Sequence, residues 1–263
     1  MSDTETEWAV ALFRKSVLKQ AKLRQILELL DDPAGKTNLD IGADNGIISY
    51  LLRQRGGRWY SADLDERAVA SIRQLVGDGV YQLDGATTPF PDRSFDQVVI
   101  VDYLEHIPDD RAFARELERI VKPGGSVIVN VPHLQPRSPL VWLRHRIGLT
   151  DQWHGHLRPG YSVASLRETL GPRFRIDRVV TYSRFGSELV DTALNGAYEA
   201  MRKRKGPSGA SKGTVVTGAD LRQYRKQMRL LSLLYPALRL TAAADRLLPW
   251  QPGHKLIARA TLR

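Results

Sequence analysis

The sequence predicts an α/β fold in which helices cover both faces of a doubly wound, mostly parallel sheet of seven strands. Strand-like and helix-like segments alternate from residue 37 to residue 183, which is typical of parallel strands joined by helical crossovers. The runs VVIV at 98–101 and VIV at 127–129 are apolar without alternation, as in strands buried on both faces. With 263 residues, 42% hydrophobic and 26% charged, the chain suits one globular domain with an elaboration.

The N-terminal segment, residues 1–35, is expected to form one helix. Apolar residues fall mainly on one helical face from residue 5 to residue 31, and the run Asp31-Asp32-Pro33-Ala34-Gly35 ends the pattern. Its first residues, MSDTETE, are acidic and polar, unlike a secretory signal. The longest apolar stretch, near Leu230–Leu238, is shorter than the roughly 20 residues that span a bilayer. We therefore expect a cytoplasmic protein.

Residues 36–186 and 251–263 are expected to form the sheet and its helices. The predicted strands are Thr37–Ile41, Gly57–Ala62, Val80–Leu83, Phe95–Val101, Ser126–Val131, Phe174–Ser183 and Lys255–Thr261. The predicted helices between them are Gly46–Arg53, Glu66–Leu75, Arg111–Val121 and Val163–Leu170. A long loop rich in Pro, His, Arg and Trp follows Pro132, and the alternating pattern of the last strand suggests an edge position.

Residues 187–250 read as a basic, amphipathic helical insertion before the last strand. Helices at Glu188–Lys203 and Asp220–Leu248 flank a Gly/Ser/Lys linker at Lys205–Gly213, and Pro236 is expected to kink the second helix. The insertion holds eleven Lys and Arg against five Asp and Glu, in a chain of net charge +10. Three interpretations stay open: a cap over the core, a surface that binds anionic membranes, and a surface that binds RNA phosphates.

The loop after the first strand reads Asp40-Ile41-Gly42-Ala43-Asp44-Asn45-Gly46 and leads directly into a helix. Glycines at 42 and 46 permit a tight turn and close approach of a ligand to the backbone. The spacing is neither the dinucleotide G-x-G-x-x-G nor a P-loop. Asp40 and Asp44 make the turn acidic, which favours a ligand carrying an ammonium or sulfonium over a pyrophosphate.

A second acidic side chain, Asp63, ends the second predicted strand. Ligands of open α/β sheets bind at the carboxyl ends of the strands, and a carboxylate in this place can accept both hydroxyls of a ribose. The pattern therefore indicates a nucleoside without identifying it. Asp65 is expected to cap the following helix instead.

These motifs, with two more in order, resemble the class I S-adenosylmethionine-dependent methyltransferases and in particular their UbiE-like, methyltransferase type 11 group. The resemblance runs from about Asn38 to Ser183 through LDIGADNG, SADLDERAV, QLDGATTPFPDRSFDQVVIVDYLEHIPD and IVKPGGSVIVNVP. PFPDRSFDQVV and KPGG are much more specific than the glycine loop. The resemblance implies a Rossmann-like core with an antiparallel seventh strand, and S-adenosyl-L-methionine as cofactor.

The resemblance also implies a set of cofactor-binding residues. They are Asp40, Gly42, Asp44, Gly46, Asp63, Leu64, Asp84, Gly85, Ala86 and Asp102. The first loop would surround the methionine end, Asp63 would bind the ribose, and Leu64 would lie on one face of the adenine. Asp84 and the Gly85–Ala86 backbone would contact the adenine edge. Asp44 replaces the middle glycine of the family's G-x-G-x-G, where its side chain could reach the cofactor's ammonium or narrow the pocket.

Three residues are candidates for catalysis: Tyr103, expected near the methyl group, and His106 and His154 as bases. Methyl transfer from a sulfonium depends mainly on alignment, and a base helps when the acceptor is a hydroxyl. Packing or capping would also explain His106, and simple exposure to solvent would explain His154 and His156. A metal site is not expected, because no third ligand for this H-x-H pair is evident in the sequence.

The leading functional hypothesis is methyl transfer, on oxygen or carbon, to a small-molecule, lipid or glycan acceptor. If the insertion binds lipid, the protein would act at the inner face of the membrane. An RNA methyltransferase and a non-catalytic module that binds the nucleoside are alternatives. The missing G-x-G-x-x-G and the presence of KPGG make a nicotinamide-dependent oxidoreductase the weaker hypothesis.

Overall fold

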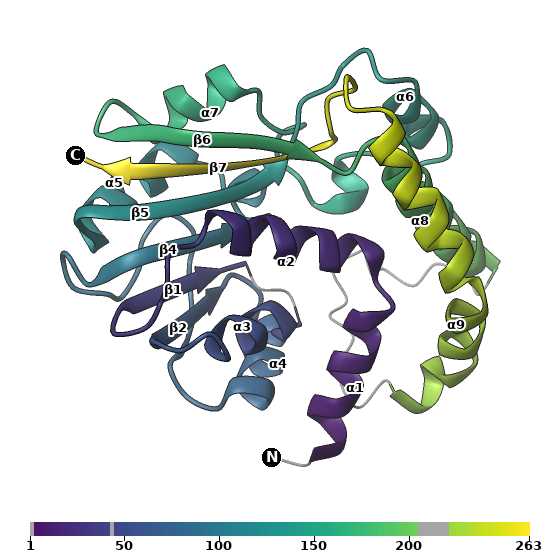
Figure 1. The fold of residues 1–263 in the computed structure, drawn as a ribbon, viewed down its shortest axis with the longest axis horizontal. Helices are drawn as coiled ribbons and strands as arrows, with labels where there is room; N and C mark the ends of the chain where they lie inside the picture. Colours follow the sequence, from purple (N-terminus) through teal and green to yellow (C-terminus); the bar gives the residue numbers. More distant parts are fainter. Residues whose placement is uncertain (1–2, 43–44, 205–220) are drawn as a thin grey trace.

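The computed structural model describes residues 3–42, 45–204 and 221–263. Within them, the strands form one seven-stranded sheet in the order β3-β2-β1-β4-β5-β7-β6 (Figure 1). The strands are β1 Thr37–Ile41, β2 Arg58–Asp63, β3 Val80–Gln82, β4 Phe95–Val101, β5 Val121–Pro132, β6 Phe174–Tyr182 and β7 Lys255–Leu262. Only β7 runs antiparallel to its neighbours, which confirms the predicted fold class.

Helices lie on both faces of this sheet, and the structure assigns their bounds as follows. The α-helices are α1 Asp3–Arg14, α2 Val17–Leu29, α3 Ile47–Arg53, α4 Glu66–Val76, α5 Asp110–Ile120, α6 Pro139–Arg146, α7 Val163–Leu170, α8 Phe185–Arg204 and α9 Leu221–Ala243. Single 3-10 turns are η1 Leu104–His106, η2 Gln152–His154 and η4 Ala244–Leu247.

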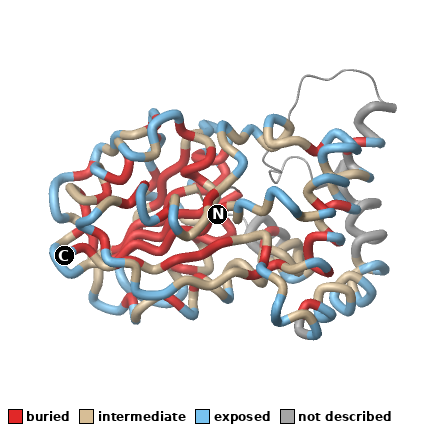
Figure 2. The backbone as a smooth tube through the Cα atoms, turned by 90° about the horizontal axis from the view of Figure 1, so that it is seen from above, coloured by how far each residue is buried: buried red, intermediate tan, exposed pale blue. Residues whose placement is uncertain are grey.

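The central strands are buried on both faces, as their uninterrupted apolar runs predict. Successive side chains of a strand point to opposite faces. On β4, Val98 and Ile100 therefore pack against α5 and α7, whereas Val99 and Val101 pack against α2 and α3. Figure 2 shows the buried sheet as the red centre of the molecule, with the helices around it partly exposed.

The predicted single helix over residues 5–31 is wrong at its middle, because the chain breaks into α1 and α2 at Ser16. Ser16 has an extended backbone, and its hydroxyl accepts a hydrogen bond of 3.3 Å from the amide of Lys19. A serine in this position satisfies an amide that the first turn of a helix leaves without a partner. The apolar pattern continues across the break, so periodicity alone did not reveal it. Figure 1 shows the two helices at a clear angle.

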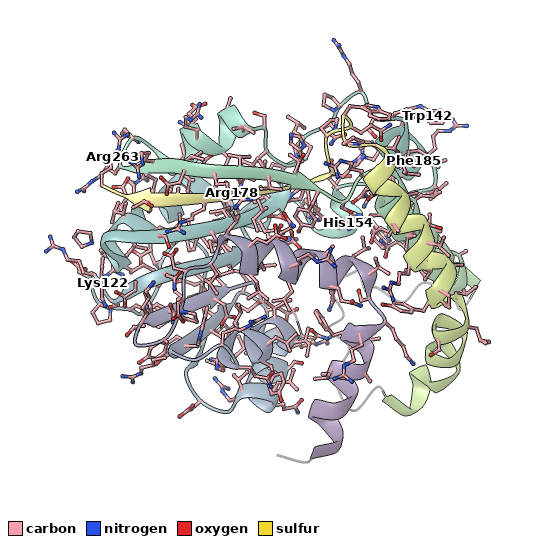
Figure 3. All side chains as sticks on the ribbon, viewed as in Figure 1. Lys122, Trp142, His154, Arg178, Phe185 and Arg263 are labelled. Carbon is pink, nitrogen blue, oxygen red and sulfur yellow. The ribbon has the colours of Figure 1, made fainter. Side chains whose placement is uncertain are left out.

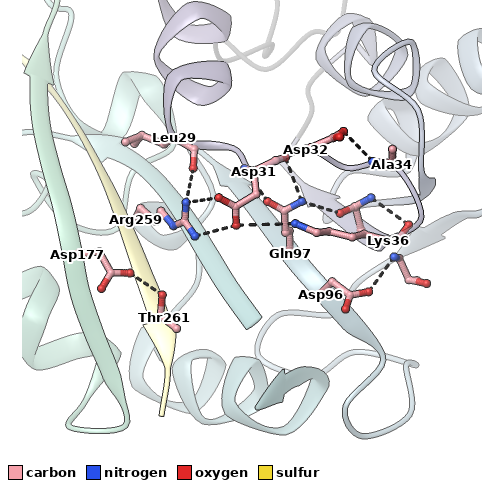
Figure 4. A network of polar contacts seen from close by, with 12 residues as sticks. Leu29, Asp31, Asp32, Ala34, Lys36, Asp96, Gln97, Asp177, Arg259 and Thr261 are labelled. Carbon is pink, nitrogen blue, oxygen red and sulfur yellow. Dashed lines mark hydrogen bonds and ion pairs between the residues drawn. The ribbon is translucent and has the colours of Figure 1, made fainter. Parts of the chain in front are cut away.

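The expected edge position of the last strand is also wrong, since β7 lies between β5 and β6. Its polar residues resemble those of a strand with a solvated face, but α2 covers that face. Arg259 forms a two-pronged ion pair with Asp31 at the end of α2, at 2.5 and 2.7 Å (Figure 4). A charged side chain with such a partner can lie on an inner strand.

The loop after Pro132 contains more regular structure than the sequence suggested, whereas the insertion contains the two helices that the sequence predicted. The loop forms α6 and the short turn η2. In the insertion, α8 and α9 pack on each other, and α9 contacts the N-terminal helices through Lys15 with Ser232 at 2.5 Å and Gln20 with Tyr235 at 3.3 Å. Pro236 lies inside α9. The predicted linker Lys205–Gly213 falls outside the described residues.

Candidate cofactor and active site

The turn after β1 depends on glycine at two positions. Gly42 has a φ of +80°, and a Cβ there would lie 2.1 Å from the carbonyl oxygen of Val101 at the end of β4. Gly46 has a φ of +84°, and its Cβ would lie 2.8 Å from the Cα of Ile72 in α4. Both residues therefore bring the turn close to neighbouring elements, as only glycine allows. Asp44 falls outside the described residues, and its contact with a cofactor stays a prediction.

Asp40 lies on β1, fully buried, and its carboxylate is bonded to protein groups. The hydroxyls of Ser49 and Ser61 donate to it at 2.5 and 2.9 Å, and Arg53 lies 3.5 Å away. Burial raises the pKa of Asp40, against the opposing effects of Arg53 and the two serines. These bonds join β1 to α3 and β2, so Asp40 supports the base of the loop. Its predicted contact with the methionine end of a cofactor is untested.

Asp63, Asp84, Gly85 and Tyr103 converge at the carboxyl rim of β2, β3 and β4. The buried Tyr103 hydroxyl donates a 2.6 Å hydrogen bond to the carbonyl of Gly85. Burial raises the pKa of Tyr103, and the nearby carboxylates of Asp63 and Asp84 raise it further. The phenol is therefore neutral, and it joins the turn after β3 to the end of β4.

The neighbours of this cluster present both apolar and acidic groups. Leu64 and Ala86 are half-buried and pack against the apolar core that also contains Tyr103. Asp63 is nearly buried and accepts a 3.1 Å bond from the amide of Asp65, which in turn caps α4 as expected. Asp84 is exposed and accepts a bond from Thr87 at 2.9 Å. Acidic and apolar side chains thus lie side by side on the rim.

Asp102 follows β4 in a left-handed backbone conformation, with a φ of 44°. Lys22 of α2 forms a short ion pair with it, Lys255 of β7 lies 3.7 Å away, and the amide of Asn130 donates at 2.9 Å. Burial raises the pKa of Asp102, but the two lysines outweigh burial and hold the pKa well below its usual range. Asp102 is therefore a charged residue that ties α2 and β7 to the rim.

Glu105, which the sequence motifs did not single out, is buried next to Asp102 in η1. Both of its carboxylate oxygens lack a hydrogen-bond partner among the described residues. Burial and the charge of Asp102 raise the pKa of Glu105 to about 8. The sequence contains Glu105 in the segment Leu104-Glu105-His106, in which only the histidine was a candidate functional residue.

The structure brings the two histidine regions together beside Asp102. His106 is hydrogen-bonded through Nδ1 to the carbonyl of Gly155 at 3.0 Å, and its ring lies 5.0 Å from that of His156. His154 stacks on His156 at 5.3 Å, and its Nε2 accepts a 3.0 Å bond from Arg144. His154, labelled in Figure 3, faces the side of α6 and α8. Nε2 of His154 therefore already accepts a hydrogen bond from the Arg144 guanidinium. The role of His154 as a base stays a prediction.

Comparison with known proteins agrees with this geometry. Residues 39–129 match the family model described as a methyltransferase domain. This part of the chain, 91 of its 263 residues, is similar to the class I S-adenosylmethionine-dependent methyltransferase family. S-adenosyl-L-methionine is the methyl donor of this family, and the matched residues run from β1 through most of β5.

Similar proteins include several methyltransferases. The ubiquinone biosynthesis O-methyltransferase of Pseudomonas paraeruginosa is 35% identical over 114 residues, 41% of this chain. This chain covers 49% of that protein, so it spans about half the length of the curated relative it matches. The S-adenosylmethionine-dependent methyltransferase of Mesorhizobium loti has a TM-score of 0.54 at 16% identity, with 92% and 96% of the two chains covered.

The same fold also supports other chemistry. The (4+2)-cyclase SpnF has a TM-score of 0.59 at 17% identity, with 93% of this chain and 80% of that chain covered. Likeness of fold does not determine the reaction, which depends on the residues of the site. The acceptor and the catalytic residues of this methyltransferase domain therefore depend on the side chains at the rim.

Proposed function

We propose that this protein transfers a methyl group from S-adenosyl-L-methionine to an oxygen or carbon of a small-molecule acceptor. The observation that supports it most is the convergence of Asp63, Asp84 and Gly85 around Tyr103 at the carboxyl rim. Open α/β sheets bind nucleosides at this rim. An acidic rim with half-buried apolar neighbours suits an adenosyl sulfonium, which combines an apolar base, a ribose and positive charges.

In this proposal each of the ten predicted cofactor residues lies near the part of the cofactor that suits its chemistry. Asp63 accepts the ribose hydroxyls, while Leu64 and Ala86 contact the adenine. Asp84 and the backbone at Gly85 accept from the adenine edge. The turn with Gly42, Asp44 and Gly46 surrounds the methionine end, with Asp40 below it and Asp102 beside it. Holding the sulfonium in line with the acceptor supplies most of the rate effect, since the leaving group is already good.

Calorimetric titration with S-adenosylmethionine, S-adenosylhomocysteine and NAD tests the cofactor. We expect binding of the first two and none of NAD. Asp63→Ala should weaken binding at least tenfold. Asp65→Ala is the matched control, because it removes an adjacent exposed carboxylate that caps α4, and it should change stability by about 1 kcal/mol with little effect on affinity. Equal affinities of the two variants would contradict the proposed ribose contact.

The acceptor is proposed from the relatives, which are named ubiquinone biosynthesis O-methyltransferases. A hydroxyl acceptor needs a base, and His106 and His154 are the proposed candidates next to the rim. Incubating cell extract with the protein and isotopically labelled methyl donor, followed by mass spectrometry, would identify the product. Labelled RNA would instead support the RNA alternative. Cofactor binding without any labelled product would support a non-catalytic module.

We also infer that α9 contacts an anionic lipid surface, which would suit a lipid or lipid-linked glycan acceptor. Leu233 and Leu240 lie two turns apart on α9 and are 79% and 74% exposed. Leu247 in η4 and Trp250 are exposed as well, each at 74%. None of the described helices has the length and apolar character needed to cross a bilayer.

Charge favours an anionic surface as the partner. The insertion carries eleven basic and five acidic residues within a chain of net charge +10. Apolar side chains flanked by basic ones bind at the interface of anionic membranes. Trp142 of α6 and Phe185 of α8 are also exposed, and Figure 3 shows both at the upper right of the view. A protein bound in this way would act at the inner face of the membrane.

Co-sedimentation with phosphatidylglycerol and phosphatidylcholine vesicles tests the lipid contact. We expect binding to the anionic vesicles only, lost in Leu240→Glu. Gln82→Glu is the control, because it adds the same charge at an exposed position of β3, at the far edge of the sheet. If the protein ignores anionic vesicles at low salt, the surface has another role, such as contact between two copies.

A further inference from the structure

A cluster of three potential metal ligands lies beside the proposed cofactor site. Glu105, His106 and His156 each offer one ligand atom, and these atoms lie within 4.8 Å of one another. The first two come from η1 after β4, whereas His156 comes from the turn after η2, about fifty residues later. The sequence showed no third ligand for the pair His154 and His156, and the cluster in the fold instead joins His156 to His106 and Glu105.

Glu105 has a feature that hydrogen bonding within the protein does not explain. It is fully buried, and neither carboxylate oxygen has a hydrogen-bond partner among the described residues. Buried polar groups nearly always have a partner, because an unpaired one loses its hydration without compensation. The nearby cations Lys22 and Lys255 are bound to Asp102. A ligand at the cluster would satisfy the carboxylate of Glu105.

His106 is held in the orientation that a metal ligand requires. A carbonyl oxygen can only accept, so Nδ1 of His106 donates its proton to the carbonyl of Gly155 at 3.0 Å. This bond selects the tautomer in which Nε2 carries the lone pair. Metal-binding histidines commonly donate their second ring nitrogen to a carbonyl or carboxylate in the same way.

His156 is also positioned by the backbone around it. Its amide donates to the carbonyl of Asp151 at 2.9 Å, and the next amide, of Leu157, donates to the carbonyl of Glu105 at 2.8 Å. The second bond fastens the turn directly to η1. On one side, the ring of His156 stacks on His154 at 5.3 Å. The cluster is therefore built by several independent contacts.

We propose that Glu105, His106 and His156 bind a divalent transition-metal ion, with Zn²⁺ as the ion that fits best. Two imidazoles and one carboxylate are a common ligand set for zinc sites that keep a coordination position open. Water or an oxygen of a small ligand would complete the coordination. The inference rests on these three residues and their supports, and it does not depend on methyl transfer. A zinc-bound His106 has no free ring nitrogen, so His154 would then be the candidate base.

Titration of chelator-treated protein with zinc chloride, followed by calorimetry, tests the site. We expect one Zn²⁺ per chain, and at least tenfold weaker binding in both Glu105→Gln and His156→Ala. His145→Ala is the matched control, since it removes an exposed histidine of α6 outside the cluster and should leave the affinity unchanged. Co²⁺ should give a visible absorption band that both ligand variants lose.

Two further measurements exclude unfolding of a variant as the cause of its lost zinc binding. Circular dichroism must show that each variant is folded, and His156→Cys should retain most of the zinc affinity, because a thiolate is also a zinc ligand. If the ligand variants bind Zn²⁺ as tightly as the unmodified protein, or if that protein binds none, the site is refuted. Titration of the zinc-free protein with S-adenosylmethionine reports separately on the proposed function.

Discussion

At the scale of single residues, Tyr103 shows how one hydroxyl can organise a binding rim. Its hydrogen bond to Gly85 joins the turn after β3 to the end of β4, and its ring lies 4.9 Å from Phe113 of α5. The side chain is 2% exposed. The predicted place of Tyr103 near the methyl group is untested, but its contacts indicate that it positions the residues around Asp84.

Tyr103→Phe should destabilise the protein by about 1–2 kcal/mol, because the buried Gly85 carbonyl loses its donor. We expect weaker S-adenosylmethionine binding, from a looser turn at Asp84 and Gly85, and a turnover at saturating cofactor that changes little. Urea unfolding and calorimetry measure the two effects. A turnover that fell by orders of magnitude with unchanged cofactor affinity would instead indicate direct participation of the hydroxyl.

His254 makes stability depend on pH between about 4 and 6.5. Burial, together with the positive charge of Arg144, lowers the pKa of His254 to about 4. The unfolded chain therefore binds a proton below about pH 6.5, where the folded protein does not. Above about pH 6.5 the histidine is neutral in both states, so its ionisation does not change the free energy of unfolding. As the pH falls from 6.5 to 4, protonation of the unfolded chain lowers this free energy by at most about 3 kcal/mol. His254→Gln should flatten the dependence in urea unfolding, and equal slopes would contradict it.

At the scale of elements, the turn between β1 and α3 depends on close packing against two neighbours. Gly42 meets the end of β4 and Gly46 meets α4. Below the turn, Asp40, Ser49, Ser61 and Arg53 form a buried polar network. The proposed methionine site is thus supported from below by hydrogen bonds and from the side by backbone contacts.

Gly42→Ala should abolish S-adenosylmethionine binding and cost more than about 2 kcal/mol of stability, because its Cβ would overlap the Val101 carbonyl and its φ is positive. Gly124→Ala is the control. Gly124 has a similar φ of +77°, but no atom lies within 4 Å of its added Cβ, so the cost should be about 1 kcal/mol with binding intact. Similar losses in both variants would show that backbone conformation, and not packing, determines the turn.

At the scale of the whole molecule, charged pairs connect the sheet to the segments that cover its carboxyl rim. Lys22 joins α2 to Asp102, while Asp31 joins the other end of α2 to Arg259 of β7. Arg144 of α6 donates to Glu188 of α8 at 2.8 Å and lies 3.4 Å from Asp191. These pairs hold together parts of the chain that are far apart in sequence.

Arg144→Met should loosen α8 from α6. Glu188 is 2% exposed, so removal of the Arg144 cation leaves a buried carboxylate with the Ser183 hydroxyl as its remaining donor, at a cost of about 3–5 kcal/mol. The rate of amide hydrogen exchange should increase more in α8 than in β4. Arg146→Met removes an arginine of the same helix that lies over the exposed ring of Trp142, and it should have little effect. Unchanged exchange in α8 would contradict the role of Arg144.

Local sequence pattern by itself determined much of this molecule. The alternation of strands and helices, the glycines at 42 and 46, and the acidic residues that end β2 and β3 were all readable from the sequence. They depend on interactions within a few residues, such as side-chain periodicity, turn conformation and strand ends. The sheet and the place of Asp63 at the end of β2 were predictable for this reason, whereas the antiparallel β7 and the role of Asp84 were expected from the family resemblance.

Only the tertiary structure decided how distant side chains pair. Ser16 breaks a continuous apolar pattern, β7 lies inside the sheet because α2 covers its charged residues, and Glu105 meets His156 through a turn some fifty residues away. Each outcome depends on which surface packs on which, and the burial and partners of a charge are set by that packing. A sequence displays the charge, but the fold determines what it faces.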